Sequence, residues 1–257
     1  MQFLDMDKNP KISVITPSTR PEFLLIIEKC LKRQDFTDFE WIITSPVEIT
    51  TVKPTLLLKD PPKLKDDFWT LCKGWNNAYA HAKGELIVNI QDGIWFDPTI
   101  LSKFWFHYQN QPRILVSAIG HQYEGFDDRG VPLNKVWHDP RSKTGISFEE
   151  VPPSEMEMVM CSIPKQALIE CGGIDEEYDT CNGAQEKEMC WRLNKMNWDF
   201  YIDHNIEYKA IHHPRLTDNW DKVYFEKTTP LFTRHMMELE SGTRKLNQVN
   251  LLKYLNK

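Results

Sequence analysis

An aspartate at the end of an apolar run is the first residue whose position could support chemistry. Asp92 follows residues 86–90 and is flanked by Gln91 and Gly93. A carboxylate at the tip of a buried strand can bind a divalent cation, although Asp-Gly is also a common turn pair. Taken alone, the pair favours a turn, so the surrounding sequence must decide between turn and ligand.

A second carboxylate lies near the start of a helical pattern over residues 185–195. Glu186, Met189 and Leu193 share one face of this helix by three- and four-residue spacing. The helix dipole favours an ionised carboxylate at this end, whereas partial burial raises its pKa. Glu186 is therefore a candidate general base, and the alternative is a glutamate that only stabilises the helix N-terminus.

Short strands and helices alternate along the chain and must position these two carboxylates. Apolar, β-branched runs predict strands, in chain order, at residues 12–16, 39–44, 55–58, 86–90, 114–118 and 158–163, with one more near Phe200. Helical spacing predicts helices at residues 23–31, 69–82, 97–109, 164–171 and 185–195. This order is typical of an α/β fold with a mostly parallel sheet, which binds ligands at the carboxyl ends of its strands.

Composition excludes several classes of protein. Hydrophobic residues make up 41% of the 257 residues, which is enough for a packed interior and excludes global disorder. The net charge of −6 argues against a protein that coats nucleic acid or an anionic membrane. Six scattered cysteines show no zinc-binding spacing, and no run is long and apolar enough to span a membrane. We therefore expect free thiols and a cytoplasmic location.

Two common phosphate-binding motifs are missing. The first predicted strand is not followed by GxGxxG, and GxxxxGK[ST] occurs nowhere. The missing motifs therefore argue against a dinucleotide oxidoreductase and a P-loop phosphotransferase, and a bound phosphate must be held in another way.

Segments at several places in the chain resemble the landmarks of family 2 glycosyltransferases, in the same order and at similar spacings. They are ISVITPSTRP at residues 12–21, WNNAYAHAKGE at 75–85, IQDG at 90–93, CGGIDEE at 171–177 and QEKEMCWRL at 185–193. The resemblance covers roughly residues 11–213.

The resemblance implies a GT-A fold, a Rossmann-like mixed sheet flanked by helices, that binds a nucleotide sugar, usually a UDP-sugar. It also implies a divalent metal, Mn²⁺ or Mg²⁺, that holds the diphosphate. The residues matching nucleotide-contacting positions are Thr16, Pro17, Arg20, Asn76, Gln91 and Asp92. Those matching metal positions are Asp92 and one of His212 and His213. Glu186 matches the catalytic base, with Glu188 and Arg192 at the later charged positions of the same motif.

The chain departs from the family pattern in three places. Residues 44–46, Thr-Ser-Pro, replace an acidic pair that commonly holds the nucleobase, which leaves the choice of uridine open. Gln91 and Gly93 stand where further aspartates often occur, so the metal affinity should be modest until the diphosphate binds. Glu186 replaces an aspartate, which keeps the carboxylate on a longer side chain.

We expect a glycosyltransferase domain over residues 1–218, with a nucleotide-binding half at 11–118 and an acceptor and base half at 119–218. In the second half, residues 121–153 form a long polar connection in which Trp137 either stacks on an acceptor sugar or anchors the loop.

Residues 219–257 should form a basic helical extension. Residues 222–257 hold seven Lys and Arg against three Glu, a net +4, which leaves −10 for the rest of a chain of net charge −6. This extension serves the acceptor or an oligomer contact, or it simply packs on the core.

The sequence thus predicts an inverting transferase that moves a hexose from a nucleotide sugar to an acceptor hydroxyl, with Glu186 as base and Asp92 as metal anchor. The acceptor stays open among a glycan, a lipid-linked sugar, a protein and a hydroxylated DNA base, and the acidic body disfavours nucleic acid. One alternative is a sugar nucleotidyltransferase, which normally has a glycine-rich loop that TPSTRPE lacks. The other is a non-catalytic nucleotide-sugar-binding protein of the same fold, as the reduced metal motif suggests.

Overall fold

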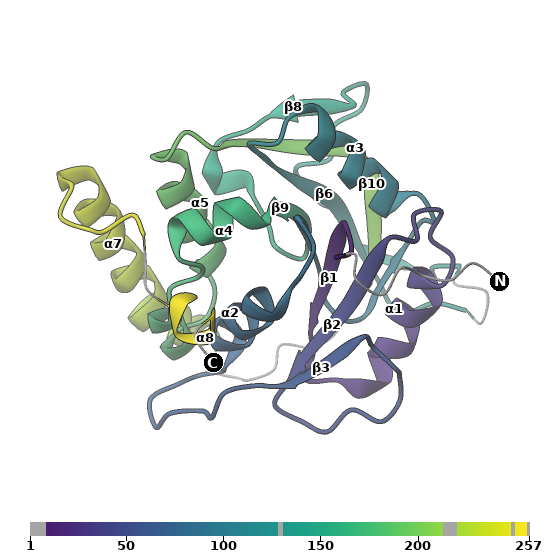
Figure 1. Cartoon of the computed structure of the whole chain (residues 1–257), viewed down its shortest axis with the longest axis horizontal. Helices are drawn as coiled ribbons and strands as arrows, with labels where there is room; N and C mark the ends of the chain where they lie inside the picture. Colours follow the sequence, from purple (N-terminus) through teal and green to yellow (C-terminus); the bar gives the residue numbers. More distant parts are fainter. Residues whose placement is uncertain (1–8, 128–130, 213–219, 248–249, 256–257) are drawn as a thin grey trace.

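The computed structural model describes residues 9–127, 131–212, 220–247 and 250–255. Within these residues, ten strands form one mixed sheet with helices on both faces (Figure 1). In sheet order the main strands are β3 (Leu56–Lys59), β2 (Phe39–Ser45), β1 (Ile12–Pro17), β4 (Leu86–Ile90), β9 (Met160–Pro164), β6 (Ile114–Tyr123), β10 (Asp199–Ile211) and β5 (Ile94–Phe96). Off this path, β7 (Lys135–Trp137) pairs with β6, and β8 (Phe148–Glu150) pairs with β10.

The strand directions bring several carboxyl ends to one edge of the sheet. Strand β1 is parallel to β2 and β4, and β2 is parallel to β3. Strand β9 is antiparallel to both β4 and β6, so β4 and β6 point the same way. The expectation of a mostly parallel sheet holds from β3 to β4, and β9 makes the whole sheet mixed. The carboxyl ends of β1 to β4 and of β6 therefore share one edge, called here the donor edge.

Two layers of helices cover the two faces of the sheet (Figure 1). Helices α1 (Leu24–Leu31) and α3 (Ile100–Asn110) pack on one face. Helices α2 (Leu71–His81), α4 (Lys165–Cys171) and α5 (Gln185–Asn194) pack on the other. Successive strand residues point to opposite faces, so Val14 belongs to the first core and Ile15 to the second.

Short 3-10 turns and a remote cap complete these layers. The turns are η1 (Pro21–Phe23), η2 (Pro153–Glu155) and η3 (Glu176–Thr180). Asp179, the fourth residue of η3, accepts hydrogen bonds from the first turn of α2, at 2.8 Å from Cys72 N and 3.1 Å from Lys73 N. Burial raises the pKa of Asp179 to about 7, against the lowering effect of these bonds. A helix N-terminus is thus satisfied by a side chain more than a hundred residues away in sequence.

Several elements differ from the sequence-based expectation. Strand β5 was not expected, and β6 and β10 are much longer than predicted, because β10 pairs with β6 on one side and with β5 and β8 on the other. The register of β10 against β6 shifts between Asp203 and Glu207. The helix expected from Asp97 begins at Ile100 instead, and Thr99 at its N-cap makes no side-chain capping bond.

The C-terminal segment, residues 220–255, consists of α6 (Trp220–Val223), a π-helical turn η4 (Tyr224–Thr228), α7 (Thr229–Ser241) and α8 (Leu252–Leu255). Helix α7 contacts α5, and α8 contacts α2 (Figure 1). Leu239, Leu251 and Tyr254 are buried in these contacts. The segment therefore packs on the core, and the expected division at residues 218 and 219 lies outside the described residues.

Candidate active site

The donor edge brings Asp92 together with two residues from the loop after β1. Ser18 Oγ donates to Asp92 Oδ2 at 2.7 Å, and Arg20 forms an ion pair with the same carboxylate through Nη2 and Nε. The Arg20 guanidinium also lies 4.9 Å from the centre of the Phe23 ring. Its Nη1 is buried and has no hydrogen-bond partner within the described residues. A cation with one unused nitrogen thus stands at the strand tips, where an anionic ligand would bind.

Two other residues predicted to contact the nucleotide are used inside the protein. Thr16 is buried and its Oγ1 accepts from Trp41 Nε1 at 3.0 Å. Asn76 is buried, accepts from Ile174 N at 2.9 Å and donates to the carbonyl of Ile174 at 2.8 Å. Asn76 therefore ties α2 to the loop after α4, and its role toward a nucleotide stays a prediction.

The remaining two, Pro17 and Gln91, lie at the donor edge itself. Pro17 is the last residue of β1, and Gln91 directly follows β4. Both are half-buried, and the backbone N–H of Gln91 donates to the carbonyl of Val159 at 2.9 Å. This bond brings the approach to β9 against the tip of β4.

Asp60 is a donor-edge carboxylate that the sequence analysis did not single out. It follows β3 and accepts from Thr44 Oγ1 at 2.5 Å and from Thr70 Oγ1 at 2.8 Å. Burial raises its pKa, opposed by these two hydrogen bonds. Residues 44–46 after β2 contain no carboxylate, and Asp60 after β3 places one beside Thr44. No local pattern distinguishes Asp60 from other polar residues of its loop, because its position depends on the pairing of β2 with β3.

The end of β10 returns to the donor edge beside Gly93. The backbone N–H of Ile211 donates to the carbonyl of Gly93 at 2.9 Å. The next residue, His212, is exposed and its Nδ1 lies 2.8 Å from Gln122 Oε1. The backbone bond of its neighbour Ile211 therefore keeps His212 close to the Asp92 turn, while His213 lies outside the described residues.

The ligands available for a divalent cation at Asp92 form a partial set. Asp92 is the single carboxylate of residues 91–93, and its two oxygens are already used by Ser18 and Arg20. A hard cation prefers several oxygen ligands. It would bind here in place of the Arg20 guanidinium, with the oxygens of a diphosphate completing its coordination. The residues therefore fit a metal ion that would bind together with a nucleotide diphosphate.

Glu186 has the environment expected of a base. The side chain is half-buried, and its Oε2 is shielded from solvent without a hydrogen-bond partner among the described residues. Burial raises the pKa of the Glu186 carboxyl, and the negative charge of Glu157 acts in the same direction. The backbone N–H at the helix start and the charge of Lys187 oppose this shift. A partly desolvated carboxylate with one oxygen free of hydrogen bonds can accept a proton from a bound hydroxyl.

Glu157 lies just before β9 and is a second acidic group of this region. Arg141 Nη2 lies 3.1 Å from Glu157 Oε2, and the same guanidinium bonds Asp139 at 2.7 Å. Asp139 is fully buried and also accepts from Gly120 N at 3.1 Å. This buried pair anchors the long connection between β6 and β9. Trp137, expected to anchor that loop or stack on a sugar, is 40% exposed on β7, so the anchoring belongs to its neighbours.

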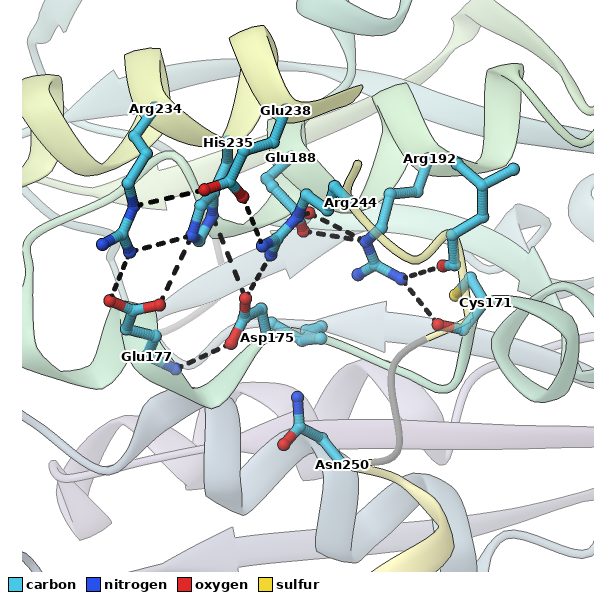
Figure 2. Close-up of polar contacts among 12 residues, drawn as sticks. Cys171, Asp175, Glu177, Glu188, Arg192, Arg234, His235, Glu238, Arg244 and Asn250 are labelled. Atoms are coloured by element: carbon cyan, nitrogen blue, oxygen red, sulfur yellow. Dashed lines mark hydrogen bonds and ion pairs between the residues drawn. The ribbon is translucent and has the colours of Figure 1, made fainter. Parts of the chain in front are cut away.

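Glu188 and Arg192, which lie further along helix α5, have a structural role. Both are fully buried, and Arg192 Nε lies 2.9 and 3.0 Å from the two oxygens of Glu188 (Figure 2). Arg192 also donates to the carbonyls of Cys171 at 2.6 Å and Gly173 at 2.8 Å. Arg192 thus pairs with a carboxylate inside the protein.

A group with metal-like spacing lies beside this pair. Asp175, Glu188 and His235 each place one ligand atom within 4.8 Å of the others. Arg244, however, bonds both Asp175 and Glu188, so a cation already occupies the position between the two carboxylates (Figure 2). His235 is buried, and burial lowers its pKa, with the charge of Arg244 adding to the effect. The group is therefore an internal ion-pair network.

The sequence matches no protein-family model and no curated protein. The structure is similar to S. aureus TarS 1-349 in complex with UDP, with a TM-score of 0.60 and 15% identity over 96% of this chain and 71% of that chain. The TarS 1-349 complex with UDP-GlcNAc gives 0.58 and 15% over 96% and 72%. The chain has the GT-A fold.

A further S. aureus TarS structure aligns over 79% of this chain and 37% of that chain, with a TM-score of 0.57 and 16% identity. The similarity to these neighbours confirms, at the level of the fold, the resemblance found in the sequence. Within the described residues, no helix combines the length and the apolar composition needed to cross a lipid bilayer.

Proposed function

We propose that this protein is an inverting glycosyltransferase that transfers a hexose from a UDP-sugar to an acceptor hydroxyl. The observation that carries the proposal is Glu186, whose carboxylate has one shielded oxygen without a hydrogen-bond partner among the described residues, on a GT-A fold whose donor edge holds a paired Arg20 and Asp92. Buried acids in proteins are normally hydrogen-bonded, and an exception is a candidate for proton transfer.

The donor edge supplies groups for each part of a UDP-sugar. The unused Nη1 of Arg20 is suited to a diphosphate oxygen, because guanidinium groups form charge-assisted hydrogen bonds with phosphate. Asp60, with Thr44 and Thr70, offers a carboxylate that can accept from the ring N–H of uracil. The similarity to TarS complexes that contain UDP and UDP-GlcNAc supports the same choice of nucleotide.

In the proposed reaction the acceptor oxygen attacks the anomeric carbon from the face opposite the diphosphate. The new C–O bond forms as the bond to the diphosphate breaks, and the leaving group keeps the electron pair. Glu186 takes the proton of the acceptor hydroxyl, which is a poor nucleophile at neutral pH without a base. Arg20 binds the leaving diphosphate. A divalent cation bound at Asp92 would neutralise charge that develops on that diphosphate.

A nucleotide-sugar screen tests the proposal. The purified protein is mixed with UDP-, GDP- and TDP-sugars, thermal shift identifies the donor that binds, and release of nucleoside diphosphate is followed without an acceptor. We expect a UDP-sugar to stabilise the protein and to be hydrolysed slowly. Binding without release would favour the non-catalytic alternative, and stabilisation by GDP- or TDP-sugars alone would overturn the assignment of uridine.

A further inference from the structure

The C-terminal segment contacts the chain on both sides of Glu186. Thr228 Oγ1 accepts from Asn182 N at 3.0 Å and donates to the carbonyl of Asn182 at 3.0 Å. Beyond the base, Arg244 Nε donates to Glu188 Oε1 at 2.8 Å. Asn182 lies four residues before Glu186 and Glu188 two residues after it. The candidate base is therefore bracketed by two contacts from one segment.

The contact before the base supports a backbone under strain. Ala184, the N-cap of α5, has φ 69°, a left-handed conformation that costs a residue with a side chain about 1 kcal/mol. Such a conformation persists only where the surroundings enforce it. Thr228 is almost fully buried and bonds both backbone groups of Asn182, two residues earlier, so it fixes the approach to α5.

The contact after the base depends on how α7 ends. Gly242 has φ 72° and caps α7, and the backbone N–H of Arg244 then donates to the carbonyl of Glu238 at 3.1 Å. This turn sends the Arg244 side chain into the protein, where it bonds Glu188 and Asp175 (Figure 2). Glu188 thereby receives one guanidinium from its own helix and one from the C-terminal segment.

Stabilisation does not explain the second guanidinium. Arg192 already pairs with both oxygens of Glu188, and burying a further ion pair costs desolvation that roughly cancels its attraction. A fully paired buried network is better suited to fixing one geometry. Here it joins α5, the loop at Asp175 and the C-terminal segment, which are far apart in sequence.

We infer that Thr228 and Arg244 are positioning residues that hold the first turn of α5 so that Glu186 faces the acceptor. This inference rests on the proposed function. It gives the basic C-terminal segment a role in catalysis that does not involve contact with the donor. Other cations of the segment contrast with Arg244, because Arg234 and Lys253 are exposed and pair with Glu177 and Glu176, outside α5.

The decisive variant is Thr228→Val, which keeps the shape of the side chain and removes its hydroxyl. Release of UDP from UDP-GlcNAc gives kcat and KM, and calorimetry gives the Kd for UDP. We expect kcat to fall about 10- to 100-fold, because small displacements of a catalytic group have large effects, with KM and Kd within about twofold of wild type. Thr228→Ser, which retains the hydroxyl, should restore kcat to within about threefold.

Arg244→Met is the second variant, with Arg234→Met as its matched control from the same segment. We expect Arg244→Met to lower kcat with little change in Kd, and Arg234→Met to leave both near wild type. A folded Thr228→Val protein with wild-type kcat would overturn the inference. So would a loss of UDP affinity as large as the loss of kcat, because the segment would then serve the donor site.

Hydrogen exchange separates this inference from the proposed function. Backbone amides of residues 186–190 should exchange faster in Thr228→Val and Arg244→Met than in Arg234→Met, while those of β4 stay unchanged. Unchanged exchange in both variants overturns the positioning role whatever the enzyme does. A wild-type protein that neither binds UDP nor releases it would overturn the proposed function and with it the catalytic part of the inference, whereas faster exchange in the two variants would still show that Thr228 and Arg244 hold the first turn of α5.

Discussion

The carboxylates at the donor edge and those on helix α5 differ in how they are paired. At the donor edge, Asp92 is held by Ser18 and Arg20, so its negative charge is paired. On α5, Glu188 is paired twice, whereas Glu186, two residues earlier, keeps one shielded oxygen without a partner. Pairing lowers the basicity of a carboxylate and fixes its position, whereas desolvation without a partner raises its pKa. Asp92 and Glu188 are thus each held by a cation, whereas Glu186 keeps an oxygen that is available for a proton.

The largest effect is expected at Glu186. Glu186→Gln keeps the size of the side chain but removes the base, so turnover should fall about 10²- to 10⁴-fold with donor affinity nearly unchanged. Initial rates of UDP release or transfer, together with the Kd for UDP, measure the two quantities. Near-normal turnover in this variant, with an inactive but folded Glu188→Gln, would place the base at Glu188 instead.

The next effect concerns Asp92. Asp92→Ala removes the partner of Arg20 and the candidate metal ligand, so most activity should be lost while the fold is kept, a fall of about 10²-fold or more. Circular dichroism checks the fold, and assays with EDTA and with added Mn²⁺ or Mg²⁺ check the metal. Full activity in excess chelator would show that Arg20 alone neutralises the diphosphate.

Substitution of Glu188 should lower the stability of the protein. Glu188→Gln leaves Arg192 and Arg244 buried without their carboxylate, and breaking a buried ion pair from one side costs about 3–5 kcal/mol of the free energy of unfolding. Urea denaturation measures this loss. A change below about 1 kcal/mol would mean that the two arginines find other partners in the variant.

Turnover and stability should both depend on pH through Glu186. Only the ionised form of Glu186 can act as base, and its pKa is raised, so turnover should fall about tenfold per pH unit as the pH drops below that raised pKa. The contribution of Glu186 to stability changes with pH in the opposite direction. The folded state binds the proton more tightly than the unfolded state, so this contribution is complete below the ordinary glutamate pKa and is lost as pH rises through the raised one. Glu186→Gln should remove both dependences.

The smallest effect is expected at the surface. Lys253 pairs with Glu176 at 3.2 Å and is about half exposed, so Lys253→Met should change the free energy of unfolding by less than about 0.5 kcal/mol. Thermal denaturation at low and high salt checks this. A loss comparable to that of Glu188→Gln would show that the exposed cations of the C-terminal segment also hold it in place.

Local pattern was enough for the main elements of the donor edge and the base helix. The predicted strands at residues 12–16 and 86–90 and the helix from residue 185 are observed as β1, β4 and α5 within one residue. Met189 and Leu193 are buried on the predicted face, and Glu186 is shielded beside them. These features follow from periodicity within a single element, which the order of residues specifies directly.

Contacts between elements that are distant in the chain could not be predicted from local sequence pattern. Arg20 and Asp92 were each singled out by resemblance, but their ion pair across 72 residues depends on β1 lying beside β4. Asp60 was missed because its position depends on the pairing of β2 with β3.

The sequence by itself thus determined the main strands and helices of the donor edge and of α5, and which helix face carries a carboxylate. The tertiary structure decided which of the carboxylates stay unpaired. Arg244 reaches Glu188 from 56 residues away only because α7 ends in a left-handed glycine beside α5. Whether a buried charge is compensated depends on the sum of neighbours from every element packed around it, and that sum is set by the sheet order and the helix packing rather than by local periodicity.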